Sequence, residues 1–298
     1  MEKKIVLVAG GTGLIGSKLV ERLCEQGHEV RILSRRSFKD DDAEGIYHWL
    51  PEIGKIDQEA IEGVQVIINL AGASVAGQRW TAKRKDYLIR SRTESALLLS
   101  NMAALMPDLE HYLSASGINA YGYSDGQKEF CEPDPFGEDF LADVVEKWEA
   151  AADLFQPHCK VSKLRIGVVF SKDGGAFQRI ALPIKLFMGS PLGNGRQMMP
   201  WVDIDDVVAA FLFLIENQLE GVYNCVNGNV SNELLTQEIA HQAGRPLFFP
   251  NVPAGALRLM LGEMSDLVLK GLSASNQKII NAGFQFNNNL AAAVKKAL

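Results

Sequence analysis

A glycine-rich segment near the N-terminus carries the clearest chemical signal of the chain. The segment reads Gly10-Gly11-Thr12-Gly13-Leu14-Ile15-Gly16. Three of its glycines stand in a GxxGxxG spacing. In that spacing Gly10 permits a tight turn, Gly13 lets the backbone approach a pyrophosphate, and Gly16 lets a helix pack on a strand. The free amides at the start of that helix would face the anion. We expect these seven residues to hold a dinucleotide; the alternative is an ordinary strand-to-helix turn.

A second signal follows the next apolar run, which ends in Ser34-Arg35-Arg36. An NAD site usually places an acidic side chain there, where it accepts hydrogen bonds from the ribose hydroxyls. Two guanidinium groups after a serine can instead hold a 2′-phosphate through charge-assisted hydrogen bonds. The pattern favours NADP over NAD as the cofactor. The alternative is a solvated arginine pair in a loop that also contains Asp40-Asp41-Asp42.

These residues need a scaffold in which strands end side by side. Short apolar runs alternate with stretches in which apolar residues recur at helical spacing, and Gly27 ends the first such stretch. The alternation predicts an α/β fold, a Rossmann-type doubly wound parallel sheet with helices on both faces. The predicted strands include residues 5–9, 30–33, 64–70 and one starting at 112–114, and the predicted helices include 14–27 and 93–106; residues 47–51 are ambiguous.

The second half of the chain reads differently. A strand at 163–170 is followed by a region punctuated by glycine and proline, from Gly174 to Pro200, in which we expect ordered loops between short elements and contacts with a substrate. We therefore expect a dinucleotide-binding Rossmann domain over 1–170, onto which some later segments pack, and a smaller substrate-side and C-terminal helical portion over 171–298. The later predicted elements are a helix at 203–216, a strand at 222–226, a helix at 232–243 and small helices over 253–298.

Composition narrows the classes of protein. The chain has 298 residues, 47% of them hydrophobic, which is enough for a sizeable core. Its net charge of −6 gives no electrostatic footprint for nucleic acid. The four cysteines have neither disulfide-framework nor metal-ligand spacing, so we expect no metal site and a cytoplasmic location. The apolar run after the N-terminus is too short for a membrane span, and the sequence allows a homo-oligomer without indicating one.

Further motifs occur in a fixed order along the chain. They are the glycine turn, then Asn69-Leu70-Ala71-Gly72, then Ser114-Ala115-Ser116 leading to Tyr121-Gly122, and then a segment at 200–207 before a late helix. Together they resemble the extended short-chain dehydrogenase/reductase superfamily, the NAD-dependent epimerases and dehydratases. The resemblance implies that Leu70, Ala71 and Gly72 contact the cofactor and that Ser116 ends the strand of the catalytic serine.

Other stretches resemble one atypical branch, the epimerase family proteins with a C-terminal domain of unknown function. These stretches are Arg79-Trp80-Thr81, Ser91-Arg92-Thr93, Gly193-Asn194-Gly195-Arg196-Gln197 and Gly283-Phe284-Gln285-Phe286. The resemblance implies a nucleotide cofactor in the N-terminal half and a small-molecule substrate against the C-terminal half. It names no substrate.

The chain departs from the superfamily at its catalytic pair. Typical members carry YxxxK, in which a lysine lowers the pKa of an acid/base tyrosine. Residues 140–149 contain no tyrosine. We take Ser116 and Tyr121 as catalytic candidates, for polarising a carbonyl and supplying a proton, with Asp143 and Glu149 as further carboxylates. The alternatives are a serine satisfied at a strand end and a packed tyrosine.

Four residues are candidates for the substrate side. Arg196 and Gln197 lie in a glycine-rich loop, where an arginine can grip a phosphate or a carboxylate. Trp201 could form a wall of the pocket, and Arg79 belongs to a basic and aromatic cluster. The alternatives are a surface arginine, a buried tryptophan and a solvated helix face.

Two functions follow from these residues. The first is an NADP(H)-binding oxidoreductase or epimerase acting on a small polar substrate, with sugar nucleotides as one class. The second is a binding protein that senses NADP(H) and has little or no catalytic activity. The missing YxxxK favours the second, and an ordered pocket around Ser116 and Arg196 would favour the first.

Overall fold

A large mixed sheet organises the computed structural model, which describes residues 3–36, 45–124 and 128–298. The strand order is β11-β8-β6-β5-β1-β2-β3-β4, and only β4 runs antiparallel to its neighbour. The strands are β1 Ile5–Ala9, β2 Glu29–Ser34, β3 Ile46–Leu50, β4 Lys55–Ile56, β5 Val66–Asn69, β6 His111–Gly117, β8 Lys160–Ile166 and β11 Gly221–Cys225. The predicted α/β fold of Rossmann type is therefore confirmed.

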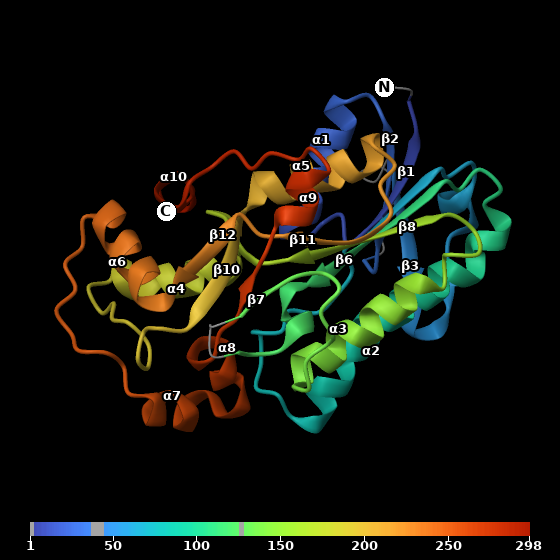
Figure 1. Ribbon diagram of the computed structural model, residues 1–298. Coiled ribbons are helices and arrows are strands. Elements are labelled where there is room, and N and C mark those ends of the chain that lie inside the picture. Colours follow the sequence, from blue (N-terminus) through green and yellow to red (C-terminus); the bar gives the residue numbers. More distant parts are fainter. Residues whose placement is uncertain (1–2, 37–44, 125–127) are drawn as a thin grey trace.

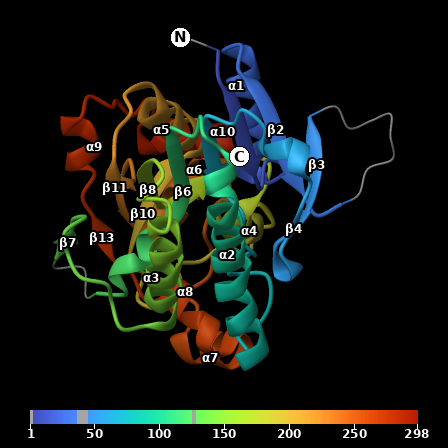
Figure 2. The same cartoon turned by 90° about the vertical axis from the view of Figure 1, so that its right-hand side faces the viewer.

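Helices cover both faces of this sheet (Figure 1). Alternate residues of β1 point to opposite faces, so Val6 and Val8 join one apolar cluster and Leu7 and Ala9 join another. The first cluster includes residues of α1 (Leu14–Glu25) and α5 (Ile204–Glu216), and the second includes residues of α2 (Ala82–Met102) and α3 (Phe140–Asp153). Figure 2 shows α2 and α3 side by side on their face.

A smaller three-stranded sheet continues from the large one. After β8 the chain turns at Gly167, where a Cβ atom would lie 2.8 Å from the Pro200 carbonyl oxygen. The predicted strand 163–170 is thus divided between two sheets, because its last part, β9 (Val168–Phe170), pairs with β10 (Met198–Asp203). β12 (Gly228–Ser231) completes this sheet, and its core includes residues of α4 (Gly175–Lys185), α6 (Asn232–Ala243) and α10 (Leu290–Ala297).

The C-terminal region consists of short elements, as predicted. They are α7 Ala254–Leu261, α8 Asp266–Leu269, β13 Ser273–Ala274, which pairs with β7 Glu129–Phe130, and α9 Gln277–Asn281, together with α10. The helix predicted at 232–243 is also confirmed, and it ends at Gly244, whose φ of 63° is the left-handed conformation expected of a C-terminal glycine. No helix in the described ranges is both long enough and apolar enough to cross a membrane.

One predicted boundary is wrong for a local reason. The helix expected from residue 93 starts at Ala82, because the Thr81 side chain caps it by accepting a hydrogen bond from Arg84 N at 3.2 Å. Its first turns are charged and mostly exposed, so they carry no apolar period. The region expected as ordered loops between short elements contains one helix, α4, which includes Pro183.

The central strand β6 begins with a histidine that has no exposed face. His111 is 3% exposed, and its Nε2 lies 2.8 Å from the Ser162 hydroxyl. That hydroxyl donates to the Leu219 carbonyl, so it accepts from Nε2–H and leaves Nδ1 unprotonated, buried and without a partner. Burial, helped by the positive charge of Lys160, lowers the pKa of His111 to about 4.

His111 therefore predicts acid sensitivity of the fold. Because its folded pKa lies below the ordinary 6.5, the unfolded chain binds the proton more readily, and stability is lost as the pH falls from 6.5 towards 4. Urea unfolding should show that the stability of the native protein, relative to His111→Gln, falls by up to about 3 kcal/mol over this range. Parallel pH profiles for the two proteins would contradict this.

Candidate cofactor and active site

The glycine turn after β1 is sterically closed to other residues. Gly10 has φ +81°, and a Cβ there would lie 2.9 Å from the carbonyl carbon of Leu70. A Cβ on Gly16 would lie 2.2 Å from the Gly10 carbonyl oxygen, which itself accepts from Gly13 N at 3.0 Å. Gly13 stands at the start of α1 and provides no side-chain cap. The amides of that helix end are thus open to an anion, and the turn fits a pyrophosphate.

The turn lies where the strand order of the sheet reverses. From β1 the sheet continues to β2 on one side and to β5 on the other, and ligands of such sheets bind at this point, beyond the carboxyl ends of the strands. Leu70 and Gly72 follow β5, and Leu70 touches Gly10. The buried side chain of Asn69 fixes this loop, because its Oδ1 accepts from Ala71 N at 3.0 Å. The structure therefore brings residues 10–16 and 70–72 together.

Ser34, Arg35 and Arg36 stand at the end of β2, on the other side of the turn. The Ser34 hydroxyl accepts from Arg36 N at 3.2 Å, and Arg35 donates to the Tyr87 hydroxyl at 3.3 Å. Both guanidinium groups are exposed, and neither forms an ion pair with any described residue. The acidic run considered as their alternative neighbour, residues 40–42, lies outside the described residues.

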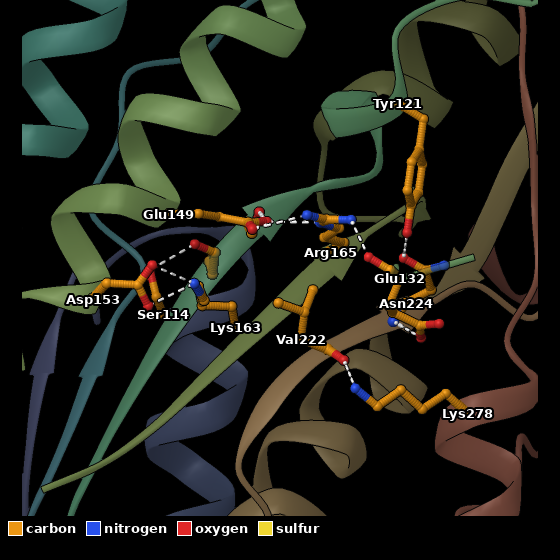
Figure 3. A network of polar contacts seen from close by, with 12 residues as sticks. Ser114, Tyr121, Glu132, Glu149, Asp153, Lys163, Arg165, Val222, Asn224 and Lys278 are labelled. Atoms are coloured by element: carbon orange, nitrogen blue, oxygen red, sulfur yellow. Dashed lines mark hydrogen bonds and ion pairs between the residues drawn. The ribbon is translucent and has the colours of Figure 1, made fainter. Parts of the chain in front are cut away.

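The two catalytic candidates belong to a buried polar network, of which Figure 3 shows Tyr121, Asn224, Glu149 and Arg165. The Ser116 hydroxyl donates to Glu149 Oε1 at 2.5 Å, and the Tyr121 hydroxyl donates to Asn224 Oδ1 at 2.8 Å. Both residues are 3% exposed, and burial raises the pKa of Tyr121 to about 12. These contacts favour the alternative reading, in which the hydroxyl of Ser116 is occupied by a structural hydrogen bond and Tyr121 is a packing residue. The catalytic roles of both residues stay predictions.

The carboxylate that holds Ser116 belongs to a ladder of ion pairs between α3 and β8. Glu149 binds Arg165 through both oxygens, at 2.8 and 2.9 Å, and Asp153 binds Lys163 at 2.7 and 2.8 Å. Four residues of helix and two residues of strand span nearly the same length, about 6 to 7 Å, so the two pairs stay in register. The spacing of the carboxylates and cations in the sequence is consistent with these two ion pairs. Predicting the pairs from the sequence would also require knowing that α3 packs against β8.

The four substrate-side candidates do not meet at one place. Arg196 and Gln197 line a cleft of about 420 Å³ together with Tyr123 and Lys270. The Gln197 amide donates to two backbone carbonyls, and its Oε1 is buried without a hydrogen-bond partner among the described residues. Lys270 forms an ion pair with Asp266 at 2.8 Å, so Arg196 is the cation of the cleft without an ion-pair partner in the described part of the chain.

The other two candidates lie elsewhere. Arg79 donates to the carbonyls of Leu259 and Met260 at the end of α7. Trp201 is 4% exposed and stacks on Phe170, with ring centroids 5.1 Å apart, in the core of the smaller sheet. Trp201 is placed by packing and does not line the cleft, so its expected role as a pocket wall is not supported.

One buried arginine was identified from the sequence only as part of a family stretch and was given no role. Arg92 lies on the apolar stripe of α2, one turn from Leu88 and one turn from Ala96, and is 8% exposed. It donates to the Ala73 carbonyl at 3.0 Å, in the loop that follows β5. A charged residue at an apolar position of a helical period was the signal that could have identified it.

Comparison with known proteins shows the family to which the chain belongs. Residues 6–141 match the model of the NAD dependent epimerase/dehydratase family, and residues 252–296 match a domain of unknown function, DUF1731. The mouse epimerase family protein SDR39U1 is 32% identical over 97% of this chain and 98% of its own. The chain belongs to the NAD-dependent epimerase/dehydratase family. A Mycobacterium leprae member, epimerase family protein ML0860, is 33% identical over 96% of this chain and 93% of its own.

Solved structures agree with this family membership. The human epimerase family protein SDR39U1, crystallised with NADPH, superposes with a TM-score of 0.89 at 30% identity over 98% of both chains. A nucleoside-diphosphate sugar epimerase from Corynebacterium glutamicum gives 0.79 at 26% identity, covering 99% of this chain and 58% of that one. The expected resemblance to the epimerase family proteins with an additional C-terminal domain is confirmed.

The glycine turn of this epimerase-family chain gives a direct steric prediction. Gly16→Ala should lower the unfolding free energy by roughly 2–4 kcal/mol, because the new Cβ would meet backbone atoms that cannot move aside. Gly255→Ala is the matched control, since Gly255 is also helical and a Cβ there would meet nothing within 4 Å. We expect it to be neutral or to stabilise by up to about 1 kcal/mol in urea unfolding. Equal losses in the two variants would contradict the analysis.

The ion-pair ladder gives a second prediction. Glu149→Gln should lower the unfolding free energy by roughly 3–5 kcal/mol, because it leaves the charge of Arg165 buried without a partner. Asp153→Asn, one helical turn away, should cost less, roughly 1–2 kcal/mol, because the Asp153 side chain is 38% exposed although Lys163 is buried. Urea unfolding of both variants measures the difference, and a similar cost for each would show that burial does not decide it.

Proposed function

We propose that this epimerase-family protein binds NADP(H) across the carboxyl edge of its large sheet. The pyrophosphate would lie on the amides after Gly10 and the adenosine 2′-phosphate at Arg35 and Arg36. The observation that carries the proposal is the end of β2, where two exposed guanidinium groups without ion-pair partners among the described residues stand in place of the carboxylate that NAD requires. The presence of NADPH in the crystal structure of human SDR39U1 supports it.

For the reaction, the proposal is hydride transfer between the nicotinamide and a carbonyl or carbinol carbon of a small polar substrate. The cofactor supplies the hydride chemistry, and the chain supplies binding and orientation. In the cleft, the exposed guanidinium of Arg196 offers positive charge to an anionic group, whereas Lys270 is paired with Asp266. A sugar nucleotide carries such groups, and one structural relative is a nucleoside-diphosphate sugar epimerase.

A second candidate function is NADP(H) sensing without turnover. The observation that favours it is the polar network, because the hydroxyls of Ser116 and Tyr121 already donate to buried acceptors. With no YxxxK pair in α3, neither Ser116 nor Tyr121 is then an evident proton donor for a substrate oxygen.

Single-turnover hydride transfer in both directions separates the two functions. The protein is loaded with NADPH and mixed with carbonyl compounds, which accept a hydride, and is separately loaded with NADP+ and mixed with nucleotide sugars, whose carbinol carbons donate one. The absorbance band of the reduced nicotinamide is followed in both. Loss of the band in the first mixture or its appearance in the second supports the oxidoreductase or epimerase, and tight dinucleotide binding without any change across both panels supports the sensor.

The arginine pair gives a test of cofactor choice. Replacing both Arg35 and Arg36 by alanine should weaken NADPH about 100-fold, because charge-assisted bonds to the 2′-phosphate are lost, and should weaken NADH by less than about threefold. Arg22→Ala is the control, since Arg22 is an exposed arginine of α1 that pairs with Glu25. Calorimetric titrations measure all the affinities. Equal losses for NADPH and NADH would remove the assignment of these residues to the 2′-phosphate.

A further inference from the structure

The guanidinium of Arg92 is buried between α2, α3 and the loop after β5. Its Nη1 donates to the Leu88 carbonyl at 2.9 Å and its Nη2 to the Ala73 carbonyl at 3.0 Å. Its Cζ lies 4.9 Å from the centre of the Trp148 ring, which belongs to α3. No carboxylate in the described part of the chain forms an ion pair with it.

A cation in this position is costly for the fold. Burial, together with the like charge of Arg84, lowers the pKa of Arg92 to about 10, so the group remains positive near neutral pH. An apolar side chain at this place in the helix would fill the same stripe without the desolvation penalty. The backbone carbonyls and the aromatic ring that hold the guanidinium compensate only partly, since none of them carries a negative charge.

The place of this charge relative to the cofactor site follows from the sheet. Gly72 is the third residue after β5, and a Cβ on it would lie 3.2 Å from Arg92 Cζ. The 2′-phosphate is proposed at the end of β2, on one side of the glycine turn. A dinucleotide that crosses the turn must therefore carry its nicotinamide half towards β5 and β6, the side on which Arg92 lies.

Neighbouring arginines do not share this environment. Arg84 donates to the Ser74 carbonyl and Arg179 to the Ala76 carbonyl of the same loop, but both contacts are exposed to solvent. Water screens such charges, whereas a charge that is surrounded by protein acts over a longer distance. Arg92 is thus the member of this group whose field reaches the cofactor side with little screening.

We propose that Arg92 biases the cofactor site towards the reduced dinucleotide. The oxidised nicotinamide ring carries a positive charge that the reduced ring lacks, so a nearby buried cation disfavours bound NADP+ relative to bound NADPH. Arg92 would act on the nicotinamide ring through its electrostatic field alone. It is therefore not a catalytic group. The cation of Arg92 lies on this side of the sheet in a chain whose α3 has no tyrosine for a YxxxK pair and whose Lys147 forms an exposed ion pair with Asp143. The inference rests on the proposed NADP(H) binding.

The test compares two affinities in each of several variants. Calorimetry gives the ratio of the NADP+ dissociation constant to the NADPH dissociation constant for the native protein, Arg92→Gln, Arg92→Lys and Arg90→Gln. We expect Arg92→Gln to lower the ratio by about fivefold or more, the effect of removing one partly desolvated unit charge. Arg92→Lys keeps the charge and should keep most of the ratio. Arg90→Gln removes an exposed arginine of the same helix, paired with Glu94, and should leave the ratio unchanged.

The outcomes separate this inference from the function on which it rests. If no variant and no native protein binds either dinucleotide, the proposed function fails. If both bind but the ratio is the same in Arg92→Gln and the native protein, the inference fails while NADP(H) binding stands. A ratio lowered equally by the glutamine and the lysine variants would also overturn it, because contact geometry rather than charge would then be the cause. Thermal unfolding with and without NADPH identifies any variant that does not fold.

Discussion

The close approach of the turn after β1 to the loop after β5 is the constraint on which the site depends. Gly10 lies against Leu70, and Gly16 lies against Gly10, with no space for a Cβ at either position. This contact brings the N-terminal end of α1 directly above the strand ends, so its amides face outward at the point where the strand order reverses. A larger residue would move the helix away and remove the donors that an anion needs. The packing of the backbone alone therefore requires glycine at these two positions, whether or not a ligand is bound.

The second feature that shapes the site is the charge arrangement on the α2 and α3 face. In the superfamily this face carries a tyrosine and a lysine, which supply a proton and a positive charge. Here the carboxylate of Glu149 and the guanidinium of Arg165 neutralise one another and hold the Ser116 hydroxyl. Arg92 on α2 is buried and forms no ion pair with any described residue, whereas Lys147 on α3 pairs with an aspartate at the surface. The face thus carries cations but lacks the tyrosine hydroxyl that a lysine acidifies in the superfamily.

The sequence predicted those parts of the structure that depend on local rules. The glycine turn, the alternation of strands and helices, and the helix ended by Gly244 follow from backbone conformation and short-range periodicity, and each is present. The break at Gly167 was not predictable, because it depends on the approach of Pro200, which is distant in sequence. The start of α2 was missed because its first turns face water.

The same distinction applies to the site. Residues 10–16 and 70–72 are close together because two adjacent parallel strands end there, which the order of elements already indicates. Trp201 and Arg79 carried residue types suited to a ligand, yet their surroundings are the core of the smaller sheet and the end of α7. The type of a residue determines what its side chain can bind. Whether the side chain is free to bind it depends on the tertiary packing around it. Ser116 and Tyr121 are further examples, since their acceptors come from α3 and β11.

Cations flank the proposed dinucleotide path at both ends, but burial gives them different physical roles. Arg35 and Arg36 are exposed, so their attraction for a phosphate is strong only at contact and weakens with salt. Arg92 is buried, so its field persists where it touches nothing and distinguishes ligands by the charge on the ring. In our proposal, affinity for the phosphate and preference for an oxidation state are set by separate residues on opposite sides of the glycine turn. Such a separation would serve a reductase, which must hold the hydride donor, and equally a sensor, which must report it. The two differ in whether a second molecule binds, because only a reductase needs a substrate, and the cleft at Arg196 is the place that we propose for it.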